Sequence, residues 1–289
     1  MDKNLRVKQW IWIGPPLIMV SLLTLVVLSY AVYLGVHDVN LLKKNFSYTG
    51  FGNFVKIWHD ARAWSSVWKT VKFVFIGTLL EAILGLALAL YLHKDFKLRK
   101  ITRSLLLIPM IMTPVVSALI WRIFYDPYSG IINYLLGIIG LGGKHDWLGN
   151  PDMALYSLII TDIWQWTPFV FLILASGLDS LPAEPYEAAK VDGASRFNTF
   201  WHITLPLLKP VILIAVMLRV IDSIKTFDLI YVMTRGGPAL KTETLNMYTY
   251  VQGMNNFNIS YASALSISIT IVLTILFVYF YKNVIAQKN

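Results

Sequence analysis

The sequence predicts an all-α membrane protein with six transmembrane helices, and both its composition and its apolar runs lead to this fold class. Of the 289 residues, 56% are hydrophobic and only 14% are charged, whereas about 25% charged residues are usual in soluble domains. The mean hydropathy is +0.60. Mostly apolar runs of roughly 20 residues, long enough to cross a bilayer as helices, recur along the chain. These runs lie at about residues 11–33, 68–92, 105–125, 153–178, 211–233 and 260–281.

The composition also excludes several classes of function. The chain has no cysteine, and its five histidines are scattered over different loops, so neither thiolate chemistry nor a metal site is expected. The formal charge of +9 does not indicate a nucleic-acid partner, because the basic residues lie between the apolar runs, where membrane topology accounts for them. Residues 138–145 lack the first glycine and the hydroxyl residue of a phosphate-binding loop, so this chain is not expected to hydrolyse ATP.

The two ends of the chain are predicted to lie in the cytoplasm. A basic tail, residues 1–10, precedes the first apolar run, which is too long for the apolar region of a signal peptide and is therefore expected to be retained. The short connection 93–103 carries five Lys and Arg residues and one acidic residue. Such loops are typically cytoplasmic, which places both tails, 1–10 and 283–289, on the same side. The first outer loop is an exception to this rule, because it carries the basic residues Lys43, Lys44, Lys56 and Arg62.

Prolines and a short apolar segment interrupt the middle of the chain. The third run contains Pro109 and Pro114, so its helix should be bent. The segment 131–141 is apolar but too short to cross a bilayer, and we expect it to lie at the membrane interface.

The polar stretch 181–206 separates the fourth and fifth runs and is interpreted as a docking surface. A short helix should start near Pro185, because the first helical turn tolerates a residue without an N–H. It should stop at Gly193, the usual residue just past a helix end. Ser195 can cap a second helix to about Ile203, which Pro206 and Pro210 should break. On the predicted topology this stretch is cytoplasmic.

The docking stretch also carries a recognisable motif. Glu187-Ala188-Ala189 is followed after three residues by Gly193 and after nine more by Ile203-Thr204-Leu205-Pro206. The pattern resembles the cytoplasmic-loop EAA motif of permease subunits in ATP-binding-cassette (ABC) importers. The likeness covers almost the whole chain after the tail and is greatest to the sugar branch, the maltose, oligosaccharide and glycerol-phosphate types.

The resemblance implies a type I ABC importer permease fold, with one transmembrane permease domain over residues 11–282. It also implies that the short helix is a coupling helix that docks on an ATPase subunit. The coupling residues would be Glu187, Ala188, Ala189, Asp192 and Gly193.

The same resemblance implies the partners. They are a second homologous permease subunit, two ATPase subunits that bind ATP and Mg, an extracytoplasmic solute-binding protein and a sugar substrate. The chain itself would be a transport subunit without enzymatic activity or a cofactor, in the bacterial cytoplasmic (inner) membrane. Transport would follow ATP-driven alternating access.

A ladder of charges interrupts the fifth run at Arg219, Asp222, Lys225 and Asp228. An unpaired charge at the bilayer centre costs about 2.5–3.5 kcal/mol on insertion scales, so these side chains should not face lipid. Opposite charges three residues apart are neighbours on a helix, which predicts the pairs Arg219–Asp222 and Lys225–Asp228. The ladder could be a structural feature buried between helices or part of a polar translocation path, and the sequence leaves both interpretations open.

The resemblance further implies a substrate site on the fourth and fifth runs. Its residues would be Gln165, Trp166, Phe169, Asp222, Ser223 and Thr226. An aromatic face beside polar groups suits a sugar ring, although the tryptophans of the fourth run could instead belong to an interfacial belt. The chain departs from the best-known family member at most of these positions, so the identity of the sugar is not implied.

Glu81 lies within the second run and has two interpretations. The first is a carboxylate hydrogen-bonded between helices, with Thr78 one turn away, and the second is a proton relay. The second would fit an ion-coupled secondary transporter with Glu81 and Asp222 as coupling groups. Such proteins usually contain internal repeats, which are not evident here. The sequence is also compatible with an ABC importer permease for a non-sugar solute. A membrane scaffold or a membrane enzyme would leave the docking motif without a purpose, and no catalytic constellation is present for an enzyme.

Overall fold

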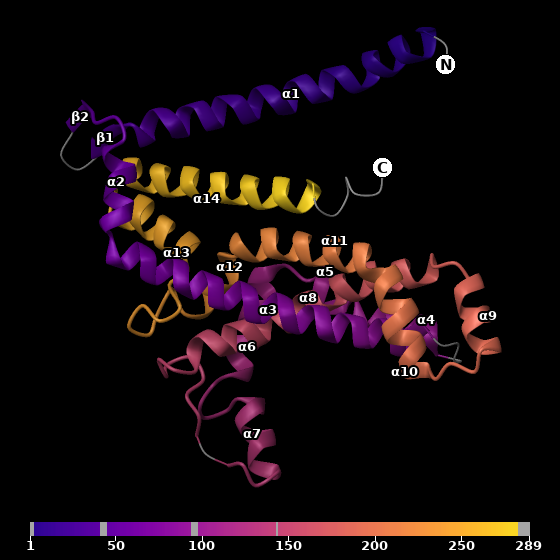
Figure 1. Ribbon diagram of the computed structural model, residues 1–289. Helices are drawn as coiled ribbons and strands as arrows, with labels where there is room; N and C mark the ends of the chain where they lie inside the picture. Colours follow the sequence, from indigo (N-terminus) through magenta and orange to yellow (C-terminus); the bar gives the residue numbers. More distant parts are fainter. Residues whose placement is uncertain (1–2, 41–44, 94–97, 143, 283–289) are drawn as a thin grey trace. The chain divides into compact units, whose positions relative to one another are not determined.

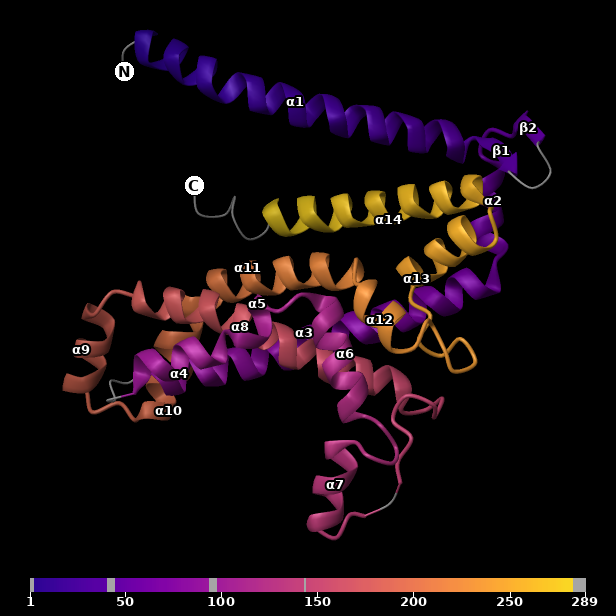
Figure 2. The same cartoon turned by 180° about the vertical axis from the view of Figure 1, so that it is seen from behind.

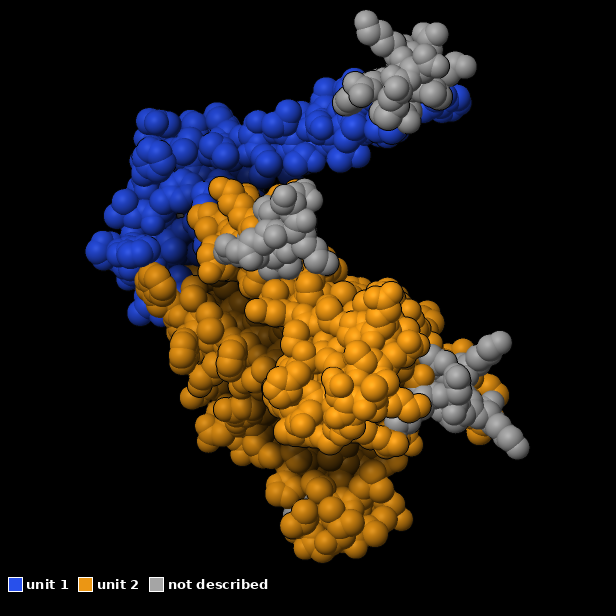
Figure 3. Space-filling view, turned by 45° about the vertical axis from the view of Figure 1, so that its right-hand side comes forward, with its two compact units in different colours: residues 1–63, 249–272 blue, residues 64–248, 273–289 orange. Residues whose placement is uncertain are grey.

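The computed structural model describes residues 3–40, 45–93, 98–142 and 144–282 (Figure 1). The predicted C-terminal tail and the basic residues Lys94 and Lys97 lie outside the described residues. The chain forms two compact units, residues 1–63 with 249–272 and residues 64–248 with 273–289, coloured separately in Figure 3.

The first unit contains the long helix α1 (Lys3–Gly35), a two-stranded antiparallel hairpin of β1 (His37–Asn40) and β2 (Asn45–Tyr48), and α2 (Gly52–His59). The π-helical segment η2 (Val251–Asn255) and the part of α14 (Ile259–Phe280) up to Val272 complete it. Nearly all described side chains of α1 are apolar and exposed within this chain, as expected of a helix that faces lipid.

Buried polar side chains hold the first unit together. The Asn53 Nδ2 donates to the carbonyls of Gly35 and His37, both at 2.9 Å, which ties α2 to the end of α1. Ser260 accepts a 2.7 Å hydrogen bond from the backbone of Val39. These bonds satisfy backbone groups that no helix or strand pairs, and an unpaired buried group would be costly.

The second unit is built on α3 (Ala61–His93, which starts in the first unit), α8 (Ala154–Asp179) and α11 (Leu205–Ile224). Most residues of α8 are buried. Small residues allow close helix packing: a Cβ added to Gly85 of α3 would lie 2.8 Å from a Val170 methyl of α8, and one added to Gly177 would lie 2.8 Å from Val211 of α11. The apolar core of this unit therefore lies where these three helices meet.

The third apolar run is divided into three short helices instead of one bent span. They are α4 (Arg99–Leu106), α5 (Ile108–Ile111) and α6 (Pro114–Phe124). The chain is extended at Met112 and Thr113, and the Thr113 hydroxyl accepts from the backbone of Val116 to start α6. The residue before a proline is disfavoured in the helical conformation, which explains the break before Pro114. The helix α7 (Ile131–Ile138) follows in the next loop.

The expectation that Pro206 and Pro210 break the second helix of the docking stretch is wrong. The helix α10 (Arg196–Thr199) continues through a π-helical turn, η1 (Phe200–Thr204), directly into α11. Pro206 is the second residue of α11, directly after the π turn. In the wider π turn the Leu205 N–H donates to the carbonyl of Phe200, five residues earlier. The hydrogen-bond register of the helix therefore changes next to Pro206, which has no N–H to donate. Helix insertions of this kind commonly occur at functional sites.

The fifth run is also not one helix over 211–233. It begins earlier, with α11, and ends at Ile224, and after a short break α12 (Asp228–Met233) follows. The chain then reaches α13 (Leu245–Tyr250) and η2. In both views α9 and α10 lie at one end of α11, and α12 and α6 lie at the other end (Figures 1 and 2).

Among the described residues, five helices are long and apolar enough to cross a membrane. They are Trp12–Gly35, Ala61–His93, Ala154–Asp179, Arg196–Ile224 and Ile259–Phe280. The remaining predicted span corresponds to α4–α6, of which α6 is an apolar helix of 11 residues, too short to cross a membrane by itself. The fold is therefore that of a multi-pass helical membrane protein, with the third crossing interrupted by its prolines.

Candidate functional site

The centre of the second unit holds a fully buried arginine. The Arg219 side chain is 1% exposed and lies on α11. Its Nε donates to Glu81 Oε2 at 2.6 Å and its Nη2 to Glu81 Oε1 at 2.9 Å. This two-point geometry between guanidinium and carboxylate is the strongest form of such a pair. Glu81 belongs to α3, where Gly77 and Gly85, four residues before and after it, are also buried.

Two further carboxylates complete this group. Arg219 Nη2 also donates to Asp162 Oδ2 of α8 at 2.9 Å, and Nη1 donates to Asp222 Oδ2 of α11 at 2.8 Å. Glu81 and Asp162 are as buried as the arginine, whereas the Asp222 side chain is 49% exposed. We call Glu81, Asp162, Arg219 and Asp222 the ion cluster. It joins α3, α8 and α11 through charge-assisted hydrogen bonds.

Part of this cluster was predictable from the sequence. The predicted pair of Arg219 and Asp222 is confirmed. Glu81 does connect helices, but its partner is Arg219, and the hydroxyl of Thr78 has no hydrogen-bond partner. Asp162 was missed. The signal was available, because Asp162 is a carboxylate inside an apolar run and therefore requires a buried partner.

The second predicted pair of the ladder is wrong. The structure, which describes both side chains, gives no ion pair between Lys225 and Asp228. The helix α11 ends at Ile224, and the chain between the two residues leaves helical geometry at Phe227, with φ −130° and ψ −53°. Residues three apart are neighbours only along a continuous helix, so their spacing does not bring Lys225 and Asp228 together here.

A cavity of about 180 Å³ opens beside the ion cluster. Of the predicted substrate residues, Gln165, Trp166, Asp222 and Thr226 line it. The Gln165 Nε2 donates to the Met112 carbonyl at 3.3 Å, while its Oε1 is buried without a hydrogen-bond partner. An unpaired buried acceptor on a cavity wall indicates a site for a donor from a ligand or water.

Two side chains, Arg219 and Phe169, contact Trp166. The guanidinium carbon of Arg219 lies 5.0 Å from the centre of its ring, within the range of a cation–π contact. Phe169 contacts the ring edge to face, with centroids 6.1 Å apart. Phe169 itself packs against the apolar core, and Ser223 is buried, so neither lines the cavity. The structure thus brings four of the six predicted residues to one cavity.

The docking stretch, residues 181–206, forms the expected short helix. The helix α9 (Glu184–Val191) has Pro185 in its first turn. Gly193 follows with a φ of +71°, and the N–H groups of Gly193 and Ala194 bond back to Lys190 and Ala189. This is the glycine-terminated helix end known as the Schellman motif, so the predicted stop at Gly193 is confirmed.

The surface of this helix is largely open. Glu187, Ala188, Asp192 and Gly193 are exposed within the described chain, whereas Ala189 is buried. Val191 is 87% exposed. The Tyr186 hydroxyl donates to the hydroxyl of Thr204 at 3.2 Å and so connects α9 to the π turn that leads into α11.

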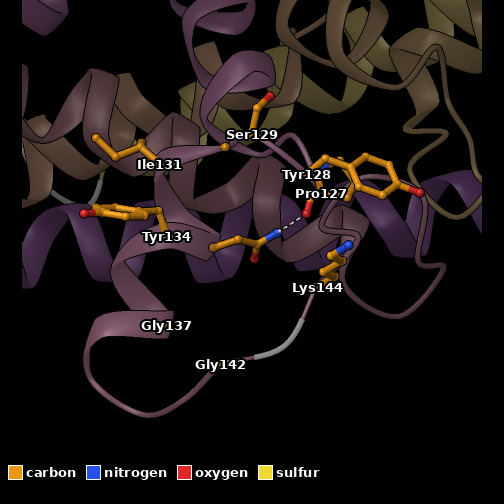
Figure 4. Close-up of a pocket in the computed structure, with 10 residues that line it drawn as sticks. Pro127, Tyr128, Ser129, Ile131, Tyr134, Gly137, Gly142 and Lys144 are labelled. Carbon is orange, nitrogen blue, oxygen red and sulfur yellow. Dashed lines mark hydrogen bonds between the residues drawn. The ribbon is translucent and has the colours of Figure 1, made fainter.

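A second hollow of about 650 Å³ lies in the loop that contains α7 (Figure 4). Asn133 supports it by donating to the carbonyls of Pro127 and His145 at 3.2 and 2.9 Å. The turn before it is set by Asp126, whose pKa is lowered by hydrogen bonds from the backbone N–H groups of Ser129 and Tyr128. None of the predicted substrate residues lines this hollow.

Helices long and apolar enough to cross a membrane, a buried ion cluster beside a cavity and the exposed helix α9 are together typical of a membrane transport subunit. Residues 81–288 match the family of binding-protein-dependent transport system inner membrane components. The chain belongs to this family and is a multi-pass ABC transporter permease.

Curated relatives support the same family. The chain is 36% identical over 259 residues to the trehalose/maltose transport system permease protein MalF of Thermococcus litoralis, covering 86% of this chain and 87% of that protein. It is 33% identical over 267 residues to the sulfoquinovosyl glycerol transport system permease protein SmoG of Agrobacterium fabrum, covering 92% and 86%.

Solved structures share the fold. A chain of a bacterial ABC transporter for the acidic polysaccharide alginate superposes with a TM-score of 0.78 at 20% identity, covering 96% of this chain and 97% of that chain. A chain of the MetNI methionine ABC transporter gives a TM-score of 0.55 over 76% of this chain. The type I importer permease fold predicted from the docking motif is therefore confirmed.

Proposed function

We propose that this chain forms, with a second homologous permease subunit, the translocation pathway of an ABC importer for a carbohydrate. The observation that carries the proposal is the cavity beside the ion cluster. It combines an aromatic face, Trp166, with the unpaired acceptor of Gln165 and the half-exposed carboxylate of Asp222. Sugars present apolar C–H faces and hydroxyl edges, and such pockets of mixed character recognise them. The names of the relatives from Thermococcus and Agrobacterium, both concerned with sugar compounds, support this substrate class.

The partners follow from the docking helix. Two ATPase subunits on the cytoplasmic side bind ATP and Mg, and one of them receives α9 through Glu187, Ala188, Asp192 and Gly193. An extracytoplasmic solute-binding protein delivers the sugar. A bacterial alginate ABC transporter that shares this fold has been solved in complex with a periplasmic protein that carries an alginate pentasaccharide, which supports such a partner. Both termini then lie in the cytoplasm, and the protein resides in the bacterial inner membrane.

The structure suggests how movement of the docking helix reaches the cavity. The helical path from Arg196 to Ile224 is continuous, and it carries both Arg219 and Asp222. Tyr186 attaches α9 to this path through Thr204. Closure of the ATPase dimer would displace α9, and the connected α11 would move the cavity wall. Alternating access then arises as a rigid-element motion, which packed helices favour over continuous deformation.

The test is reconstitution of the complete transporter in liposomes with ATP on the cytoplasmic side. ATP-dependent accumulation of a sugar, dependent on the binding protein, is the expected result. Uptake that ignores ATP and follows a proton or sodium gradient would overturn the proposal in favour of an ion-coupled transporter. ATP-driven uptake of a solute other than a sugar, with no sugar accepted, would retain the ABC permease but overturn its substrate class.

A further inference from the structure

The guanidinium of Arg219 has little capacity left for a substrate. Its Nε, Nη1 and Nη2 all donate to carboxylates of the ion cluster, at 2.6 to 2.9 Å. Its side chain is 1% exposed, and Trp166 covers one face of the group. A guanidinium binds an anionic ligand through free, accessible N–H groups. Arg219 is therefore not placed to receive the carboxylate or sulfonate of an acidic sugar.

The groups that do reach the cavity are mainly hydrogen-bond acceptors. Asp222 is half exposed there, and the Oε1 of Gln165 is buried and unpaired. The orientation of the Gln165 amide is fixed by its bond to the Met112 carbonyl, because only the amide nitrogen can donate to it. These acceptors can bind O–H or N–H donors of a ligand. Sugar hydroxyls supply them, whereas an ionised acid group has only acceptors.

The charged side chains around the cavity also favour a neutral ligand over an anionic one. Lys225 lines it, but so do Asp162, Asp222 and Asp228. Glu81 does not line the cavity but is bound to Arg219 of the ion cluster. Formally, four carboxylates face two basic side chains, Arg219 and Lys225. An anionic sugar would enter a region with an excess of like charge, which repels it.

We propose that Arg219 is a positioning residue that fixes Asp222 and Trp166 on the cavity wall, and that this wall accepts neutral sugars and rejects sugars that carry an acid group. Glu81 and Asp162 hold the guanidinium, whose remaining contacts orient the Asp222 carboxylate and the Trp166 ring. The inference rests on the proposed carbohydrate importer and specifies the charge class of its substrate.

The experiment measures binding to the assembled transporter in nanodiscs by tryptophan fluorescence. Maltotriose is the neutral probe and trigalacturonate the acidic probe, which keeps the number of sugar rings equal. A saturable change with maltotriose and none with trigalacturonate is expected. The variant Trp166→Phe should abolish the maltotriose signal and so assign it to this cavity. Equal binding of the two probes, or no binding of maltotriose, would overturn the inference.

The variant Asp222→Asn separates the role of the cavity carboxylate from folding. Asp222 is half exposed, so the change leaves no buried cavity, and maltotriose binding should weaken about tenfold, as for loss of a hydrogen bond to a charged group. Asp152→Asn makes the same chemical change on an exposed loop residue and should leave binding unchanged. Unchanged affinity in Asp222→Asn would contradict the assignment.

The variant Arg219→Lys tests positioning. Lysine keeps the charge but cannot contact three carboxylates in a plane, so maltotriose binding should weaken while trigalacturonate remains excluded. If Arg219 acts through Asp222, the double variant with Asp222→Asn should lose little more than Asp222→Asn alone, whereas a direct substrate contact would give additive losses. Independent, additive losses would overturn the positioning role.

Uptake separates this inference from the proposed function. ATP-driven uptake of trigalacturonate at the rate of maltotriose would overturn the selection for neutral sugars and leave the importer standing. Absence of ATP-driven uptake for every sugar would instead overturn the proposed function.

Discussion

Glu81 and Arg219 lie 138 positions apart in the sequence, yet they form two hydrogen bonds, at 2.6 and 2.9 Å, with both side chains fully buried. The pair connects α3 to α11 and, through Asp162, to α8. A buried charge that loses its partner is strongly destabilising, so the stability of the second unit should depend on this contact.

The variant Glu81→Gln should therefore lower stability by about 3 kcal/mol or more, because one guanidinium contact is lost and the amide N–H₂ faces a donor. The midpoint of thermal unfolding in one detergent, followed by circular dichroism, measures the effect. Glu184→Gln, the same change at an exposed position of α9, is the matched control and should shift the midpoint little. A shift of the same size in both variants would show that the buried pair contributes nothing particular.

Close packing of α3 on α8 gives a second prediction. A Cβ on Gly85 would lie 2.8 Å from a Val170 methyl and 3.1 Å from the backbone nitrogen of Phe171, so the helices must separate. Gly85→Ala should cost about 1–3 kcal/mol, as overpacking of a core does. Gly137→Ala is the control, because no atom lies within 4 Å of its added Cβ and alanine favours a helix. A thermal midpoint for Gly85→Ala that is no lower than that for Gly137→Ala would contradict this close packing.

The end of the docking helix gives a third prediction. Gly193 has a φ of +71°, and no atom lies within 4 Å of a Cβ added to it, so the main effect of Gly193→Val is a backbone strain of about 1–2 kcal/mol. The helix end would shift, and ATP-driven uptake and ATPase association should both fall.

Gly140 provides the control for that change. It also has a positive φ, +77°, with nothing within 4 Å, but it lies in the loop after α7. Gly140→Val introduces the same backbone strain far along the chain from the docking stretch and should leave ATPase association intact. Unchanged association and uptake in Gly193→Val would remove the docking role from α9.

The bond between Tyr186 and Thr204 gives a fourth prediction. Tyr186→Phe removes the hydroxyl that connects α9 to the π turn, at a cost of about 1 kcal/mol in stability. ATP hydrolysis by the assembled transporter should continue while the amount of sugar imported per ATP falls. Tyr156→Phe, an exposed tyrosine of α8, is the control and should leave the ratio unchanged. An unchanged ratio in Tyr186→Phe would exclude this bond from coupling.

The sequence alone determined the membrane class, the apolar runs and the docking helix, because these depend on local composition and on residues close together in the chain. Hydropathy requires only that a run be long and apolar. The start of α9 near Pro185 and its end at Gly193 follow from local backbone chemistry. For the same reason the pair of Arg219 and Asp222, one helical turn apart, could be predicted.

Only the tertiary structure decided which carboxylates hold Arg219 and which predicted substrate residues reach the cavity. Asp162 and Glu81 lie on other helices, and no local spacing encodes which helix faces which. The break after Ile224, which separates Lys225 from Asp228, was likewise invisible to a helical pattern. Contacts between distant segments are chosen by helix packing as a whole, so the position of each side chain in the site is a property of the folded molecule.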